Sequence, residues 1–131
     1  MFKGCSSLKA LDISFFKTDN VIDMNSLFNG CSSLSYVDVS KFKTSNVLNM
    51  QNMFNGCSLL TSLNVSNLNT KNVKYMNYMF NGCSKLTSID VSKFITNNVL
   101  DTGYMFSGYS LITSIDLSNF DAKNCSMVVL N

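Results

Sequence analysis

The chain has 131 residues, a length that suits a single domain. Its net charge is only +2, from 10 basic and 8 acidic residues, and this weak charge argues against binding to nucleic acid or to an anionic membrane surface. The sequence has no histidine, so the commonest general base and the commonest metal ligand are both missing, and no apolar run reaches the ~20 residues that span a membrane.

One unit of 26 residues is repeated five times along the chain. Its phase is marked by Phe2, Phe28, Phe54, Phe80 and Phe106, each followed two residues later by glycine. A period of this length predicts a solenoid, in which each coil buries its apolar side against its neighbours. We expect one domain over residues 1–131, with coils at 1–26, 27–52, 53–78, 79–104 and 105–131, as a piece of a longer array. We expect no secretory signal within residues 1–131, because Met1 and Phe2 already belong to the repeat.

Each coil divides into two halves. The first half follows L-x-x-[LIV]-x-[IVL], as at residues 8–13, and its final alternation has the two-residue period of a short strand. The second half, as at residues 47–54, spaces its apolar side chains by three and four, which predicts a short α or 3₁₀ turn. Glycine then ends the turn with positive φ, as we expect at Gly56. The expected fold is therefore an α/β solenoid with a parallel β-sheet on one face and short helical or 3₁₀ turns on the other.

Several columns of identical residues have a structural interpretation. Phe16, Phe42, Phe94 and Phe120 align with Leu68 and predict a second core row. The asparagine column is expected to be buried, with its amides satisfying backbone groups where each coil turns, and the threonines two residues earlier to cap the turn. These columns are Asn20, Asn46, Asn72, Asn98 and Asn124, and Thr18, Thr44, Thr70 and Thr96.

The cysteines are expected to form a reduced, buried row rather than a catalytic, disulfide or zinc site. Cys5, Cys31, Cys57 and Cys83 share one phase, whereas Cys125 has another. Four equivalent copies without a histidine partner make a poor nucleophile, and no C-x-x-C pair indicates zinc. We expect at most Cys125 to react with a bulky thiol reagent in the folded protein.

The outward positions of the predicted strands carry a column of acids, formed by Asp12, Asp38, Asn64, Asp90 and Asp116. Two interpretations of this column stay open: a solvated stripe hydrogen-bonded to its flanking serines, or a cation site or hydrogen-bonding face for a partner. Tyrosine interrupts the repeat at Tyr36 on the same face, and at Tyr75, Tyr78 and Tyr104 on the predicted helical side. Tyr78 and Tyr104 share a phase and are expected to stack, and all four tyrosines are candidates for an interface.

The repeated unit has a specific resemblance. The stretches LFNGCSSLSYVDVSKF at 27–42 and MFNGCSLLTSLNVSNL at 53–68 resemble the BspA-like leucine-rich-repeat proteins and their 26-residue bacterial surface repeat. The resemblance covers nearly the whole chain, although the fifth copy departs from it with Tyr109 in place of cysteine. It implies a surface or secreted location, adhesion to a protein or host-surface ligand, and no enzymatic activity.

We expect the chain to be a binding module of a surface protein. Two alternatives remain open: a structural spacer that self-assembles head to tail through uncapped ends, and an intracellular interaction scaffold. No catalytic residue, cofactor, metal site, nucleic-acid partner or membrane insertion is predicted, since neither a phosphate-binding loop nor a unique acid–nucleophile pair is present.

Overall fold

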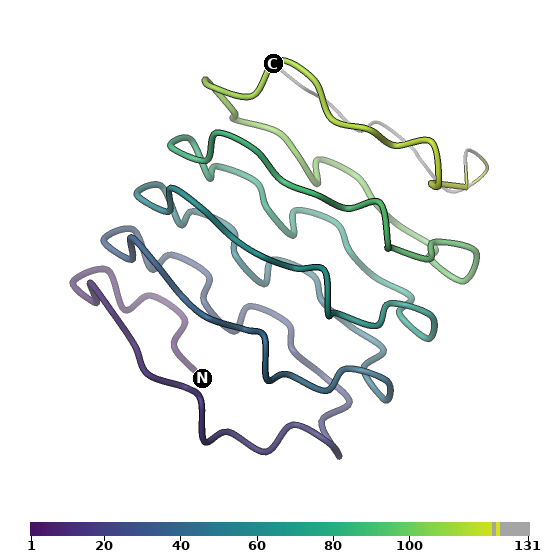
Figure 1. Ribbon diagram of the computed structural model, residues 1–131, viewed down its shortest axis with the longest axis horizontal. Coiled ribbons are helices and arrows are strands. Elements are labelled where there is room, and N and C mark those ends of the chain that lie inside the picture. The colour runs from purple at the N-terminus through teal and green to yellow at the C-terminus, as the bar shows by residue number, and fades with distance from the viewer. Residues whose placement is uncertain (122, 124–131) are drawn as a thin grey trace.

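The computed structural model describes residues 1–121 and 123. Successive 26-residue repeats lie side by side as a stack of irregular coils, with the first coil at one end of the stack (Figure 1). The stack is held together by hydrogen bonds whose partners are separated by 25 to 29 residues. Each coil therefore depends on its sequence neighbours for its backbone and side-chain partners.

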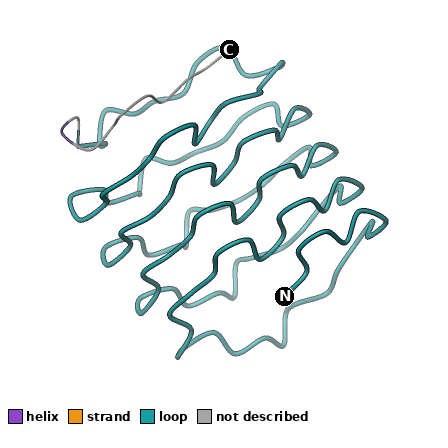
Figure 2. Cartoon of the chain, turned by 180° about the vertical axis from the view of Figure 1, so that it is seen from behind, coloured by secondary structure: helices purple, strands orange, loops and turns teal. Residues whose placement is uncertain are grey.

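The predicted α/β solenoid is wrong. The described residues contain no sheet and no helix: Lys123 alone has 3₁₀ conformation, and the remaining residues are loops and turns (Figure 2). Pairing of the strand type is limited to isolated parallel bridges, which link Asp23 to Asn49, Asn49 to Tyr75, and Tyr75 to Asp101. These bridges lie in the half of the coil that was predicted to be helical, and not in the predicted strand.

The backbone ladder between coils runs through residues 24–30 and their repeats. The N–H groups of Asn52, Phe54 and Gly56 donate to carbonyls 25 residues further along the chain, in the next repeat, at 3.1, 2.8 and 2.8 Å. The N–H groups between them donate to the carbonyl three residues earlier, as Asn55 does to Asn52 at 3.1 Å. Because alternate amides point to a neighbouring coil, the i→i−4 ladder of a helix cannot form.

Positive φ angles also exclude a helix from this segment. Glycine has φ between 72° and 79° in all five coils, which confirms the left-handed conformation expected at Gly56. Four residues before the later glycines, Ser26, Asn52, Tyr78 and Tyr104 have φ between 56° and 59°. A right-handed helix does not accommodate a left-handed residue at each of these positions.

The predicted strand is interrupted by its own side chains. The Asp38 carboxylate accepts a hydrogen bond from the Ser40 N–H at 2.8 Å, and the Phe42 N–H donates to the Val39 carbonyl at 3.0 Å. Both bonds bend the chain directly after the apolar alternation and engage amides that a parallel sheet would need. The backbone bonds between coils on this side are few and long, such as 3.4 Å from Thr61 to Ser35.

The core consists of stacked columns of apolar side chains. Phe2, Phe28, Phe54, Phe80 and Phe106 form a continuous series in which neighbouring ring centroids are 5.4 to 5.8 Å apart. In the second predicted row, Phe42, Leu68 and Phe94 are buried, whereas Phe16 and Phe120 in the outer coils are partly exposed. Aromatic pairs of this kind contribute ~0.5–1.5 kcal/mol beyond their buried area, and they fix the register of one coil on the next.

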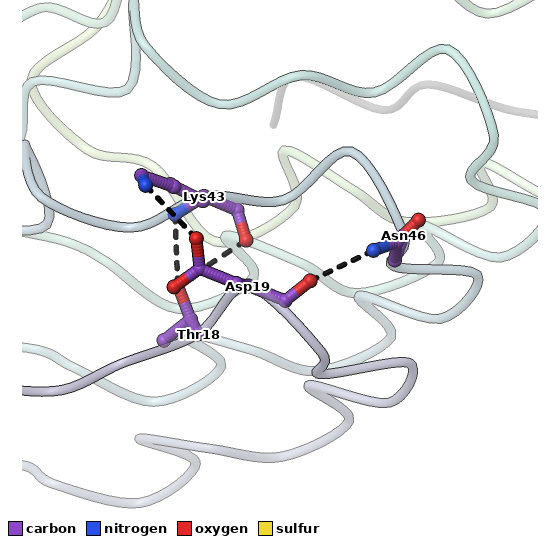
Figure 3. Close-up of polar contacts among 4 residues, drawn as sticks. All are labelled: Thr18, Asp19, Lys43 and Asn46. Atoms are coloured by element: carbon purple, nitrogen blue, oxygen red, sulfur yellow. Dashed lines mark hydrogen bonds and ion pairs between the residues drawn. The ribbon is translucent and has the colours of Figure 1, made fainter.

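The threonine column is buried and joins adjacent coils. The Thr18 hydroxyl accepts a hydrogen bond from the Lys43 N–H at 2.8 Å and donates to the Lys43 carbonyl at 3.2 Å (Figure 3). The same two bonds join Thr70 to Ile95, at 2.7 and 3.1 Å. An exposed ion pair between Lys43 and Asp19, at 2.9 Å, lies beside the first of these contacts.

The asparagine column makes the predicted hydrogen bonds to the backbone, but it lies on the surface. Asn46, Asn72 and Asn98 each donate to a backbone carbonyl of the preceding coil at 2.7 to 2.8 Å. All three are exposed, so the prediction that they are buried is wrong. The buried polar column is formed by threonine because a short hydroxyl donates and accepts at the coil interface, while the longer amide reaches across the corner from outside. Asn124 lies outside the described residues.

The cysteine row is buried except in the first coil. The thiols of Cys31, Cys57 and Cys83 donate to phenylalanine carbonyls of the preceding coil at 3.1 to 3.3 Å, and all three are unoxidised. Cys5 is exposed, so the prediction that the whole row is buried is wrong for the first coil. Cys125 lies outside the described residues. Burial raises the pKa of Cys83 to about 12.

Candidate binding face

The acid column lies on an exposed face of the stack, where each member adopts the same local geometry. The side-chain oxygen of Asp12, Asp38, Asn64, Asp90 and Asp116 accepts a hydrogen bond, at 2.8 to 3.0 Å, from the N–H of the serine two residues on. Aspartate and asparagine both close this turn through a side-chain oxygen, which explains why an amide replaces the acid in the third coil.

The serine contacts lower the pKa of the carboxylates below its ordinary value. The hydrogen bond from the Ser40 N–H lowers the pKa of Asp38, and the bond from Ser14 does the same for Asp12. The pKa of Asp90 is lowered first by its hydrogen bond with the Ser92 side chain. The four aspartates are therefore ionised at neutral pH, and the bond from serine holds one oxygen of each in place.

Tyr36 lies beside this line of charges and lines two hollows on the same face. Its side chain is 58 % exposed. On one side a shallow hollow of about 400 Å³ is lined by Tyr36, Asp12 and Asp38 together with Ala10, Leu11, Ile13 and Ser14. On the other side a hollow of about 320 Å³ is lined by Tyr36, Asn64 and Asp90 together with Ser62, Leu63, Val65, Ser88 and Ile89. We refer to Tyr36, Asp12, Asp38, Asn64 and Asp90 as the Tyr36 face.

The remaining predicted residues lie elsewhere. Asp116 is one coil beyond the second hollow and is not among the residues that line it. The hydrogen bond from the Ser118 N–H lowers the pKa of Asp116, and the nearby negative charge of Asp90 partly opposes this shift. Tyr75, Tyr78 and Tyr104 lie on the half of the coil that carries the backbone bridges. Tyr78 and Tyr104 stack as predicted, with ring centroids 5.1 Å apart and planes 10° apart. The nine candidate residues thus do not form one site.

A second tyrosine surface is exposed on the bridge side. Tyr75 and Tyr104 are 43 % and 42 % exposed, and Tyr78 is partly buried. The two hollows beside Tyr36 are lined by none of these side chains. The Tyr36 face combines an exposed ring with concave flanks and ordered charges, so it is the better candidate for recognition.

Sequence reasoning missed several exposed apolar side chains. Phe15 is 71 % exposed and follows directly after Ser14, at a position that carries lysine or asparagine in the other coils. Ile22, Leu48 and Leu100 form an exposed column at the coil corner, interrupted by Lys74. The exposure of Phe15 could have been recognised from the sequence, because Phe15 departs from the repeat. The corner column could not, because apolar residues that recur with the repeat are expected in the core.

The described residues offer no arrangement typical of a metal centre. Among them, no group of three or more cysteine or acidic side chains is placed to hold a metal ion. In the same part of the chain, no helix has the length and apolar character needed to cross a membrane.

The stacked coils define the class of the molecule, a repeat protein whose exposed columns present side chains on a stacked framework. Residues 1–120 match the family described as Mycoplasma protein of unknown function, DUF285, and the chain belongs to this family. The comparison with curated proteins and the comparison with solved structures each found no match.

Proposed function

We propose that the chain is a non-enzymatic protein-binding module of a BspA-like cell-surface protein, and that the Tyr36 face contacts the partner. The observation that carries the proposal is the exposed Tyr36 ring between two hollows lined by ionised carboxylates. Tyrosine contributes a large contact area with little loss of side-chain entropy, and it is common among residues that dominate binding energy.

The charges on this face select the chemistry of the partner. Asp12 and Asp38 line one hollow and Asp90 lines the other, while serine occupies one oxygen of each carboxylate. The second oxygen is left to accept from lysine, arginine or amide donors of a partner, so a basic protein segment is favoured over an acidic one. The resemblance of the repeat to BspA-like proteins supports a surface or secreted location and a role in adhesion.

Binding to an array of immobilised peptides tests this function. The array compares basic, neutral and acidic sequences of equal length, and binding of the labelled chain is measured at low and physiological salt. We expect selective binding to basic peptides, weaker binding at higher salt, and a loss of about tenfold or more for Tyr36→Ser. Asp38→Asn should weaken binding while preserving its serine contact, because Asn64 already makes the same contact.

Tyr75→Ser is the matched control, since it makes the same substitution at an exposed tyrosine on the bridge side of the stack. It should leave peptide binding unchanged. Equal binding by the native chain and Tyr36→Ser, or a preference for acidic peptides, would refute the assignment of this face.

A further inference from the structure

We infer that a groove at one corner of the stack docks an extended segment of a partner protein that carries an acidic side chain between apolar ones. The groove is a hollow of about 540 Å³ on the second, third and fourth coils, and we call it the corner groove. It is lined by Leu48, Asn72, Lys74, Asn97, Asn98 and Leu100. No residue of the Tyr36 face is among them, so the corner groove is a separate surface.

Apolar side chains stay exposed at this corner inside the stack. The Leu48 N–H donates to the Ile22 carbonyl at 2.8 Å, and the Leu48 carbonyl accepts from the Lys74 N–H at the same distance, so coils lie on both sides of Leu48. Its side chain is nevertheless 39 % exposed, and that of Leu100 is 62 % exposed. Stacking of coils does not bury this column, and exposed apolar side chains held in line are typical of a contact surface.

Lys74 sets the charge of the corner groove. It occupies the position that carries Ile22, Leu48 and Leu100 in other coils, so the lysine is a departure from the repeat. Its side chain is exposed and forms no ion pair within the part of the chain that the structure describes. The residues that line the groove include no carboxylate. A carboxylate of a partner is therefore the complementary group for this ammonium.

Three asparagine amides supply the polar contacts of the groove. Asn72 and Asn98 donate to the carbonyls of Ser45 and Lys71, both at 2.8 Å, which fixes these amides and leaves their oxygens as acceptors. Asn97 is exposed, and its side chain has no hydrogen-bond partner among the described residues. Its amide can therefore donate to the second oxygen of a carboxylate bound at Lys74. The oxygens of the other two amides can accept from backbone N–H groups of an extended chain.

The order of the side chains favours a protein segment over a small acid. Leu48, Lys74 and Leu100 lie in successive coils, and the Leu100 N–H donates to the Lys74 carbonyl at 2.8 Å, so a leucine flanks the lysine on each side. A small acid would pair with the lysine and leave both leucines uncovered. In an extended segment, every second side chain points to the same face. An acid with an apolar residue two positions before it and two positions after it matches all three contacts.

Fluorescence anisotropy with three labelled peptides of equal length tests the inference. The acidic peptide has a glutamate with leucine two residues before and two residues after it. The neutral peptide replaces the glutamate by glutamine, and the polar peptide replaces both leucines by serine. The native chain should bind the acidic peptide more tightly than either of the others. Higher salt should reduce the difference between the acidic and neutral peptides, because it screens an exposed ion pair.

Lys74→Leu removes the charge at a position where the repeat already has Leu48 and Leu100, so the melting temperature should stay close to that of the native chain. Binding of the acidic peptide should weaken by about two- to fivefold, as expected for the loss of an exposed ion pair, while binding of the neutral peptide should not weaken. Leu100→Ser should weaken binding of both peptides, because it removes an apolar contact that they share.

Lys71→Ser is the matched control. It removes the same charge from the same coil, serine already occupies the equivalent position at Ser45, and Lys71 does not line the groove. Binding of the acidic peptide at physiological salt should be unchanged. Tyr36→Ser should also leave this binding unchanged, so the result is independent of the function proposed for the Tyr36 face.

Three results would overturn the inference. The first is equal binding of the acidic and neutral peptides by the native chain. The second is equal weakening by Lys74→Leu and Lys71→Ser, which would indicate a general effect of charge. The third is binding to phosphatidylglycerol vesicles that is lost in Lys74→Leu, without binding of the acidic peptide, which would assign the corner groove to an anionic membrane surface.

Discussion

The hydroxyl of Thr18 joins both backbone groups of Lys43, accepting from its N–H at 2.8 Å and donating to its carbonyl at 3.2 Å. Thr18 is 6 % exposed and Lys43 belongs to the next coil, so one small side chain satisfies two polar groups at a buried interface. Thr70 repeats this contact with Ile95. The coils are thus joined by buried side-chain hydrogen bonds in addition to the backbone ladder.

Replacing Thr70 by valine should lower the free energy of unfolding by about 2 kcal/mol, because the shape is kept while two backbone groups of Ile95 lose their partner. Urea denaturation monitored by circular dichroism measures this change. Thr70→Ser keeps the hydroxyl and should retain most of the stability. A larger loss for Thr70→Ser than for Thr70→Val would mean that the methyl group, rather than the hydroxyl, holds the coils together.

Asn72→Ala should cost clearly less than Thr70→Val. Asn72 donates to the Ser45 carbonyl at 2.8 Å, but it is exposed, so water replaces the lost donor. The expected change in unfolding free energy is ~0.5 kcal/mol, measured by the same urea titration. A decrease in unfolding free energy larger than that of Thr70→Val would show that the asparagine column contributes more to stability than the threonine column.

This contrast shows what could be predicted from the sequence. The 26-residue period correctly placed the phenylalanine rows in the core and Tyr78 against Tyr104, because equivalent residues meet in stacked coils. The period does not distinguish which polar column is buried. Burial depends on how far a side chain reaches from its corner, and this distance is not encoded in the spacing of Thr70 and Asn72.

The error in secondary structure has a similar origin. The alternation ending at Val39 has a strand-like period, but the Asp38 side chain captures the Ser40 N–H and bends the chain. The apolar spacing around Met53 has a helical period, but Asn52 and Gly56 have left-handed φ angles. Apolar periodicity records which side chains face the core, and it does not decide the partners of the backbone amides. The Tyr36 face was predicted residue by residue, whereas its two hollows required the structure.

The stability of the protein should fall as pH rises above the ordinary thiol pKa. Burial raises the pKa of Cys83 from 9.0 to about 12, so between these values the unfolded chain loses a proton that the folded chain keeps. The contribution is fully present below the unfolded pKa and is lost as pH rises toward the folded one. Comparing the melting temperature of the native chain and Cys83→Ala over this pH range isolates the contribution, and the pH dependence should be shallower in the variant. Parallel curves would exclude it.

The acid column should have the opposite pH dependence. The serine contact lowers the pKa of Asp38 below its ordinary value of 3.8, so its contribution is present above that value and is lost as pH falls through the folded pKa. Asp38→Asn should remove this part of the acid destabilisation and leave the melting temperature at neutral pH nearly unchanged, because the amide retains the turn. A large loss at neutral pH would show that the carboxylate supports the fold itself.

Tyr78 combines a favourable stack with an unfavourable backbone conformation. Its φ is 59°, and its ring lies 5.1 Å from that of Tyr104. Tyr78→Asn should change the unfolding free energy by less than ~1 kcal/mol. The stack with Tyr104 is lost, but asparagine adopts this positive φ at a smaller energetic cost, and the two effects oppose each other. Tyr78→Ala should be less stable than Tyr78→Asn, since it loses the stack and gains no such tolerance. The reverse order in thermal denaturation would contradict the left-handed conformation.

Amide hydrogen exchange, resolved by residue with nuclear magnetic resonance, tests most directly the claim that the coils are joined along residues 24–30 and their repeats. The N–H groups of Asn52, Phe54 and Gly56 donate to carbonyls of the next repeat and should exchange slowly. Those of Ser62 and Asn64, in the predicted strand of the third coil, have no acceptor in the described structure and should exchange faster. Slow exchange at Ser62 and Asn64 with fast exchange at Asn52 and Phe54 would place a parallel sheet where the structure has none, and would contradict the account.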